Sequence, residues 1–235
     1  MSIRSRVESE YAKQTEVLAT CEAFQALETG RAESKSYDDF IANVCKTHLK
    51  SPQILAFLYS AAPPPVVEDI QHNLLEELGL DEEGISHPGL LVKLAKEAGF
   101  SEGRIKDLET LAEEELRRKC CEPILYGTLK EIGLSALLET VAFEWMLSRL
   151  SSRMAAFLRK YRGLSEEGLQ WFSLHSEVDI RHAEEGLDSV EKYIQYYEFD
   201  PSQVESILGI TFRENVFIKR YFGEMTLARQ TGMLR

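Results

Sequence analysis

Glycine, proline and cysteine are scarce in this chain, and so is the alternation of β-branched and polar residues that β-strands require. The 235 residues include 14 glycines, 7 prolines and 4 cysteines. Hydrophobic residues instead recur with the period of an amphipathic helix along nearly the whole sequence. The sequence therefore excludes a β-rich domain and predicts an all-α fold.

Positive charge is also in short supply. The chain has 27 basic and 39 acidic residues, a formal net charge of −12. This balance argues against nucleic acid and an anionic membrane surface as partners, because both attract basic proteins. There is no glycine-rich phosphate loop, no apolar run long enough to span a membrane, and no signal peptide in the polar N-terminal segment. We expect a cytoplasmic protein.

The cysteines carry no recognisable motif. They are Cys21, Cys45, Cys120 and Cys121. No two of them form C-x-x-C, so a zinc site is not indicated, and the adjacent pair is a poor candidate for a disulfide. We interpret all of them as reduced thiols, as is usual for a cytosolic protein.

We interpret residues 1–235 as a single helical domain, with 1–5 and 227–235 loosely held. Apolar spacing, helix-starting residues and glycine stops predict where the helices begin and end. The expected helices cover about 4–28, a segment from 36, 51–61, about 66–78, 87–99, 105–131, 135–161, 171–197, and a last segment from 201 that is broken near Gly209.

The stretch from Trp171 to Gly186, WFSLHSEVDIRHAEEG, carries the clearest site pattern. His175, Asp179 and His182 stand at i, i+4 and i+7, so a helix places them on one face, the face that also carries apolar residues. A buried carboxylate or imidazole needs hydrogen bonds or a metal. H-x3-D-x2-H is therefore a candidate metal face, although a polar surface stripe or hydrogen-bonded core histidines would give the same spacing.

Glu144 is a second polar residue on an apolar face. It stands in the segment 141–147, VAFEWML, and is the only charged residue between Glu139 and Arg149. A lone carboxylate in such a place is protonated, paired with a cation or bound to a metal. The segment alone leaves a buried salt bridge and a metal ligand open.

Two further candidates flank a polar loop. Glu77 lies on the apolar side of its helix near the C-terminal end, whereas the neighbouring Glu76 is expected to point more toward solvent. His87 begins the next helix, immediately before Pro88. An exposed glutamate pair and an ordinary loop histidine are the plain alternatives for these positions.

Together the candidates supply three carboxylates and three imidazoles from four helices. Mixed histidine and carboxylate ligation without cysteine suits iron or manganese better than structural zinc. Helical bundles build di-iron carboxylate sites from side chains that project inward in this manner. The predicted metal ligands are Glu77, His87, Glu144, His175, Asp179 and His182.

The order of these residues resembles the haem-oxygenase-like di-iron oxidases and oxygenases, whose relatives include thiaminase-like and PQQ-synthase-like proteins. The matching motifs are N-L-L-E-E-L-G from Asn73, S-H-P around His87, F-E-W around Glu144, and H-S-E-V-D-I-R-H-A from His175. They extend over residues 40–195. The loop before His87 is a few residues longer than in some members, which leaves the choice between Glu77 and Glu76 open, with helical phase favouring Glu77.

The resemblance implies an up-and-down bundle of about seven core helices that encloses two iron ions. It implies that Glu144 bridges the irons, that O2 is a co-substrate, and that Glu144 and Asp179 take the catalytic roles. The expected substrate is a small metabolite, an amino acid or a derivative, in a biosynthetic pathway. N-oxygenation, C–C cleavage and nitrile or alkene formation are the reactions implied. An external electron donor and a homodimer are further expectations.

Other functions stay open at this point. A thiaminase-like hydrolase would need a nucleophilic cysteine beside acid and base carboxylates, and a PQQ-synthase-like oxidase would need no metal. A non-enzymatic helical interaction protein would leave six inward polar groups unexplained. If the substrate is an amino acid, its carboxylate needs a cation, for which the candidates are Arg149, Arg153, Arg181 and Lys219.

Overall fold

A computed structural model describes residues 2–82, 84–121 and 126–223, and every regular element within them is a helix. The helices are α1 (Ile3–Thr20), α2 (Glu22–Thr29), α3 (Ser34–His48), α4 (Ser51–Ala61), α5 (Val67–Leu78), α6 (His87–Glu97), α7 (Glu102–Cys121), α8 (Leu129–Phe157) with a π-helical end η1 (Leu158–Arg162), α9 (Gln170–Tyr196), α10 (Pro201–Thr211) and α11 (Val216–Phe222). The predicted all-α fold is confirmed. None of the described helices has the length and apolarity to cross a membrane.

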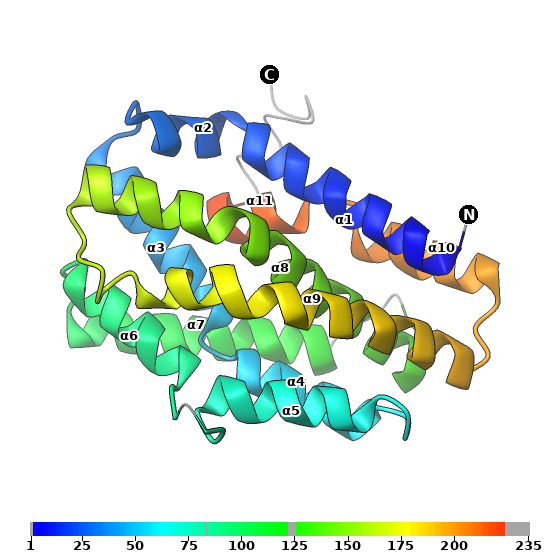
Figure 1. The fold of residues 1–235 in the computed structure, drawn as a ribbon. Coiled ribbons are helices and arrows are strands. Elements are labelled where there is room, and N and C mark those ends of the chain that lie inside the picture. Colours follow the sequence, from blue (N-terminus) through cyan, green and yellow to red (C-terminus); the bar gives the residue numbers. More distant parts are fainter. Residues whose placement is uncertain (1, 83, 122–125, 224–235) are drawn as a thin grey trace.

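The two longest helices, α8 and α9, pack along each other and form the centre of the bundle (Figure 1). On one side of this pair lie α1 and α2, and on the opposite side lie α4 and α5. α3 packs against α6, α7 and α11, and α6 also reaches α9. Helices that carry the candidate ligands therefore surround one interior region.

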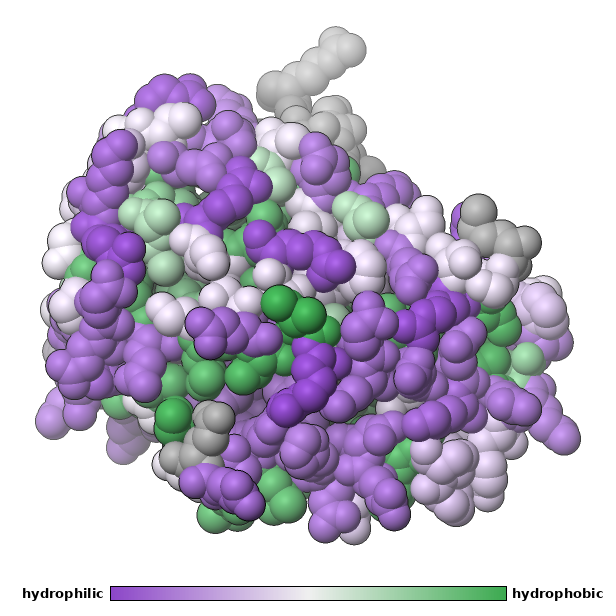
Figure 2. Space-filling model, viewed as in Figure 1, coloured by the Kyte–Doolittle hydropathy of each residue, from purple (hydrophilic) through white to green (hydrophobic). Residues whose placement is uncertain are grey.

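A continuous apolar core fills the bundle, from Val7 in α1 to Tyr221 in α11. Hydrophilic residues cover most of the face shown in Figure 2, with hydrophobic residues in limited patches between them. Polar residues inside the core are few, and they are Gln14, Thr15, His48, Glu77, His87, Ser151, His175, Asp179, His182, Ser189 and Asn215. Five of the six predicted ligands are in this set.

The first predicted helix, 4–28, is two helices. The backbone of Cys21 is extended, with ψ of 147°, so α1 ends and α2 begins there. The Cys21 thiol accepts a hydrogen bond from the amide of Phe24 at 3.4 Å and caps α2. Periodicity does not reveal such a break, because both halves present apolar residues to the same core. Residues 3–5, expected to be loose, belong to α1, whereas 227–235 lie outside the described residues.

The boundary between the predicted helices 105–131 and 135–161 is also placed differently. Thr128 and Glu131 form a reciprocal capping box, which satisfies backbone amides at the start of α8. α8 therefore begins at Leu129 rather than at Ser135. Near the C-terminus, Gly209 lies inside α10, and the break falls before Asn215, whose side chain caps α11.

The close approach of α8 and α9 depends on Gly186. A Cβ atom at this position would lie 2.6 Å from Cγ2 and 2.8 Å from Cγ1 of Val141, closer than packed carbon atoms approach. Val141 is buried and β-branched, so it has little freedom to move aside. The absence of a side chain at Gly186 lets the two central helices pack tightly.

We predict that Gly186→Ala lowers the free energy of unfolding by about 1–3 kcal/mol, because the new methyl group overpacks the α8–α9 interface. Gly209→Ala is the matched control, since a Cβ there meets nothing within 4 Å. That control should raise stability by up to about 1 kcal/mol through helix propensity. Urea unfolding followed by circular dichroism measures both, and equal effects of the two variants would contradict the packing argument.

Candidate metal centre

α9 places three candidate ligands on one buried face. His175, Asp179 and His182 are all buried, whereas Glu177 and Ile180 on the other side of the same helix are exposed. The face predicted from their spacing therefore points into the bundle. It meets the C-terminal end of α5 and the first turn of α6 there.

The turn after α5 brings the next two candidates together. Gly79 ends α5 in the left-handed conformation, with φ of 68°. A Cβ at Gly79 would lie 2.6 Å from the backbone nitrogen of Ser86, so the loop can fold back on the helix end only because glycine stands there. Ser86 then caps α6, and His87 becomes its first residue. The fold-back sets His87 beside Glu77.

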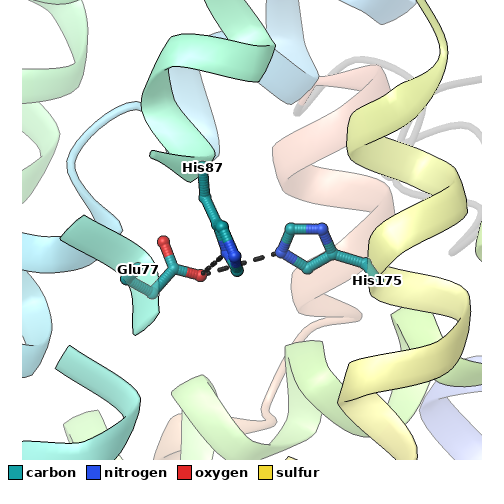
Figure 3. A group of neighbouring side chains, drawn as sticks. All are labelled: Glu77, His87 and His175. Atoms are coloured by element: carbon teal, nitrogen blue, oxygen red, sulfur yellow. Dashed lines mark hydrogen bonds and ion pairs between the residues drawn. The ribbon is translucent and has the colours of Figure 1, made fainter. Parts of the chain in front are cut away.

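Glu77, His87 and His175 form a compact group from three helices (Figure 3). Glu77 Oε1 lies 2.8 Å from His87 Nδ1 and 3.7 Å from His175 Nε2. One donor atom from each residue lies within 4.8 Å of the others, and this is the only such group of histidine, cysteine and acidic side chains in the described chain. The group has the donor types and spacing to hold a metal ion.

Neighbouring groups fix the orientation of this cluster. His175 Nδ1 lies 2.7 Å from the carbonyl oxygen of Trp171, so Nδ1 carries the proton and Nε2 faces the cluster. Ser51 donates a hydrogen bond to the second oxygen of Glu77. Burial alone would raise the pKa of Glu77, but hydrogen bonds and positive charge from His175 and His87 outweigh it and hold the pKa well below its usual range. Glu77 is thus an ionised carboxylate inside the core.

A second cluster lies one to two turns further along α9. His182 Nδ1 is 3.5 Å from Asp179 Oδ1, and His182 Nε2 contacts Glu76. Arg181 donates a hydrogen bond to the other oxygen of Glu76. Burial opposes a charged imidazole, but Asp179, Glu76 and Glu144 raise the pKa of His182 to about 10. Glu76 is slightly more exposed than Glu77, as expected, with 14% of its side chain exposed against 11%, but it packs against His182 rather than extending into solvent.

One carboxylate oxygen of Asp179, the buried Oδ2, lacks a hydrogen-bond partner. Burial raises the pKa of Asp179, although His175 and His182 oppose that shift. A cation beside this oxygen would compensate its burial, and oxygen and imidazole donors suit iron. The residues present therefore fit a metal of this class.

Glu144 reaches the same interior from α8. Its Oε1 accepts a hydrogen bond of 2.6 Å from Asn73 Nδ2 of α5. Burial and the charges of Asp179 and Glu77 raise the pKa of Glu144 to about 7, against the lowering effect of His182 and Asn73. Its carboxyl is thus sensitive to charges from both clusters. Glu144, Asp179 and His182 do not join the compact group of Glu77.

Two adjoining cavities meet at Glu144. The first, of about 70 Å³, is lined by Thr47, His48, Ser51, Ile54, Leu55, Asn73, Glu77, Lys119, Thr140, Phe143, Glu144, Leu147, His175 and Asp179. The second, of about 30 Å³, adjoins His182 and shares Glu144 and Asn73 with the first. Of the six candidate ligands, Glu77, Glu144, His175 and Asp179 line the first cavity, His182 lines the second, and His87 lines neither.

Three further residues that line the first cavity, His48, Ser51 and Lys119, have polar contacts at the site and were not among the predicted site residues. His48 is buried against Trp171, contacts the hydroxyl of Tyr221 at 2.8 Å, and burial lowers its pKa to about 3, so it is neutral. It lies one turn beyond Val44 on the same face of α3, a signal that the spacing could have given. Ser51 and Lys119 gave no signal, because their roles depend on contacts between distant helices.

The four cations proposed for a substrate carboxylate lie elsewhere. None of them lines the cavity. Arg149 covers the ring of Trp145, Arg153 pairs with Glu28, Arg181 pairs with Glu76, and Lys219 pairs with Glu214.

Comparison with known proteins bears on this site. A family model described as iron-containing redox enzyme matches residues 38–205, well over half of the chain and a span that includes all six predicted ligands. No curated protein matches the sequence. The resemblance to haem-oxygenase-like proteins is confirmed, and the chain belongs to this family of iron-containing redox enzymes.

Proposed function

We propose that this protein is a non-haem di-iron enzyme that uses O2 to oxidise a small metabolite. The supporting observation is that ionisable side chains from α5, α8 and α9 line adjoining cavities inside an apolar core, that His87 of α6 contacts Glu77 beside them, and that one carboxylate oxygen of Asp179 lacks a partner. Membership of an iron-containing redox family supports iron as the metal. The count of two ions rests on the two clusters along α9.

One metal position would use Glu77, His87 and His175, and the other would use Asp179 and His182. Glu144 lines both cavities, which supports it as the carboxylate that both positions would share. When bound, ferrous iron supplies electrons for the reduction of O2. The chain's own contribution is to fix the donors, to keep one face of each position open, and to enclose the substrate.

The residues around the donors have separate roles. Trp171 holds His175 in one tautomer through its carbonyl oxygen. Glu76 does the same for His182, because a carboxylate at Nε2 leaves Nδ1 to face Asp179. Asn73 orients Glu144. These contacts hold the donors in position before any metal arrives, which lowers the cost of binding.

A hydrolase of the thiaminase type fits less well. No cysteine is among the described residues that line either cavity. Burial raises the pKa of the Cys45 thiol to about 12, which keeps it protonated and unreactive. An amino acid or a compound derived from one stays our proposal for the substrate.

We predict that Glu77→Gln and His87→Ala each weaken Co(II) binding more than tenfold, because each removes a donor from the compact group. Co(II) absorption in the visible range measures affinity without any turnover. Glu177→Gln is the control on α9, since this exposed glutamate faces away from the cavity. Unchanged cobalt affinity in both site variants would show that the group does not hold a metal.

We predict that Glu76→Gln lowers affinity at one metal position by about 10–100-fold, the range typical of partners behind a metal-bound histidine. The neutral amide would no longer fix the tautomer of His182. Glu184→Gln is the control, because Glu184 is an exposed glutamate of the same helix that pairs with Arg4. A stepwise Fe(II) titration should show two binding events in the native protein. In Glu76→Gln both events should remain, but one of them should have lower affinity. Two unchanged events would contradict this role.

We predict about two iron ions per chain after anaerobic loading with Fe(II), followed by O2 consumption on exposure to air. Metal analysis and an oxygen electrode measure the two quantities. Glu144→Ala should reduce O2 consumption at least tenfold. A native protein that retains no iron, or that retains it without reacting with O2, would overturn the proposed function.

A further inference from the structure

We propose that Lys119 recognises the carboxylate of the substrate, at the inner end of a basic passage between α3, α4, α7 and α11. This inference deepens the proposed function and rests on it for the identity of the reaction. Its geometric basis is independent of any metal. Lys119 also takes the place of the four cations first considered for binding a substrate carboxylate, which were Arg149, Arg153, Arg181 and Lys219.

Lys119 stands on the wall of the cavity that the candidate ligands face. It lies near the C-terminal end of α7 and lines this cavity together with Glu77, Glu144 and Asp179. Among the described residues that line it, Lys119 is the only lysine or arginine. A negatively charged group that enters this space therefore has one fixed cation to meet.

A smaller cavity of about 20 Å³ adjoins the first. Its lining consists of Lys46, Thr47, Lys50, Ile54, Ala112, Glu115, Leu116, Lys119 and Arg220. Thr47, Ile54 and Lys119 line both cavities. Lys119 therefore lies where this cavity with four basic residues, which forms the proposed passage, meets the space beside the candidate ligands.

The charges around Lys119 do not cancel. Its Nζ lies 2.7 Å from Oε1 of Glu139, which also lies 3.3 Å from Arg220. Glu115 pairs with Arg220 at 2.6 Å and with Lys46 at 3.1 Å. Three cations share two carboxylates, so one positive charge is left over. A single excess charge suits a monoanion such as a carboxylate better than a phosphate dianion.

The ammonium group has capacity for a further ligand. A lysine carries three N–H donors, and the contact with Glu139 needs only one of them. Burial lowers the pKa of Lys119, although Glu139 opposes the shift, so a second anion beside it would help to keep it charged. A carboxylate in the cavity would therefore gain a charge-assisted hydrogen bond.

The hydrophobic residues of the lining favour a ligand whose remaining part is apolar. Ile54, Leu55, Phe143 and Leu147 provide hydrophobic surface in the cavity that Lys119 shares with Glu77, Glu144 and Asp179. A carboxylate held at Lys119 would direct the chain of a small molecule along this surface toward Glu144. Lys119 would thus determine which part of the substrate reaches the reactive position.

The test measures carboxylate binding without metal. Chelating-resin-treated protein is titrated by calorimetry with hexanoate, with its uncharged analogue hexanamide, and with L-norleucine, which adds an α-amine to the same chain. The native protein should bind hexanoate or norleucine at least tenfold more tightly than hexanamide. Preference for norleucine identifies an amino acid as the source of the carboxylate, and preference for hexanoate alone identifies a simple acid. A native protein without preference for either carboxylate overturns the proposal.

Two substitutions assign the effect to Lys119. Lys119→Met should abolish the preference for carboxylates while leaving hexanamide binding unchanged, which also verifies that the variant is folded. Lys119→Arg should retain the preference. Lys93→Met, which removes an exposed lysine of α6 paired with Glu167, is the control and should behave like the native protein. Retention of the preference in Lys119→Met would overturn the proposal.

Failure of this proposal and failure of the proposed function are distinguishable. Iron stoichiometry and O2 consumption do not depend on which cation binds the substrate. A protein that prefers carboxylates through Lys119 but retains no iron would refute the di-iron reading alone. A protein that binds two irons but shows no such preference would refute the role of Lys119 alone.

Discussion

The burial of ionisable side chains inside an apolar bundle is the constraint on which this structure depends. A carboxylate removed from water loses its hydration, and hydrogen bonds or a nearby cation must stabilise its charge instead. His87, His175 and Ser51 stabilise the charge of Glu77 in this way. Asp179 is stabilised only in part, because its Oδ2 has no hydrogen-bond partner. The bundle is therefore organised around a group of donors that a divalent cation would complete.

Backbone features far from one another in sequence deliver these donors to one place. Gly79 permits the chain to fold back from α5, which brings His87 to Glu77. The π-helical end η1 and the left-handed Gly163 close α8 before the chain turns into α9. Such turns cost little where glycine supplies the positive φ angle. The placement of the candidate donors thus depends on a few turn residues as well as on the helices that carry them.

The sequence predicted best those features that depend on helical phase alone. His175, Asp179 and His182 share a face because of their spacing, and the apolar side of α5 correctly favoured Glu77 as the buried glutamate. It did not reveal the contacts of Glu76 and Lys119, because their partners lie on other helices: Glu76 contacts His182 of α9, and Lys119 contacts Glu139 of α8. The break at Cys21 was also missed, because both halves of the segment keep the same apolar face.

Packing and site chemistry are coupled through the α8–α9 pair. The missing side chain of Gly186 lets Val141 approach, and it leaves the position of its absent Cβ only 3.3 Å from Oε2 of Glu144. Any residue larger than glycine would push against the helix that carries Glu144. Since Glu144 is the carboxylate that borders both cavities, its position relative to α9 decides whether it can reach the donors there. The tight central pair is therefore a requirement of the site as well as of the core.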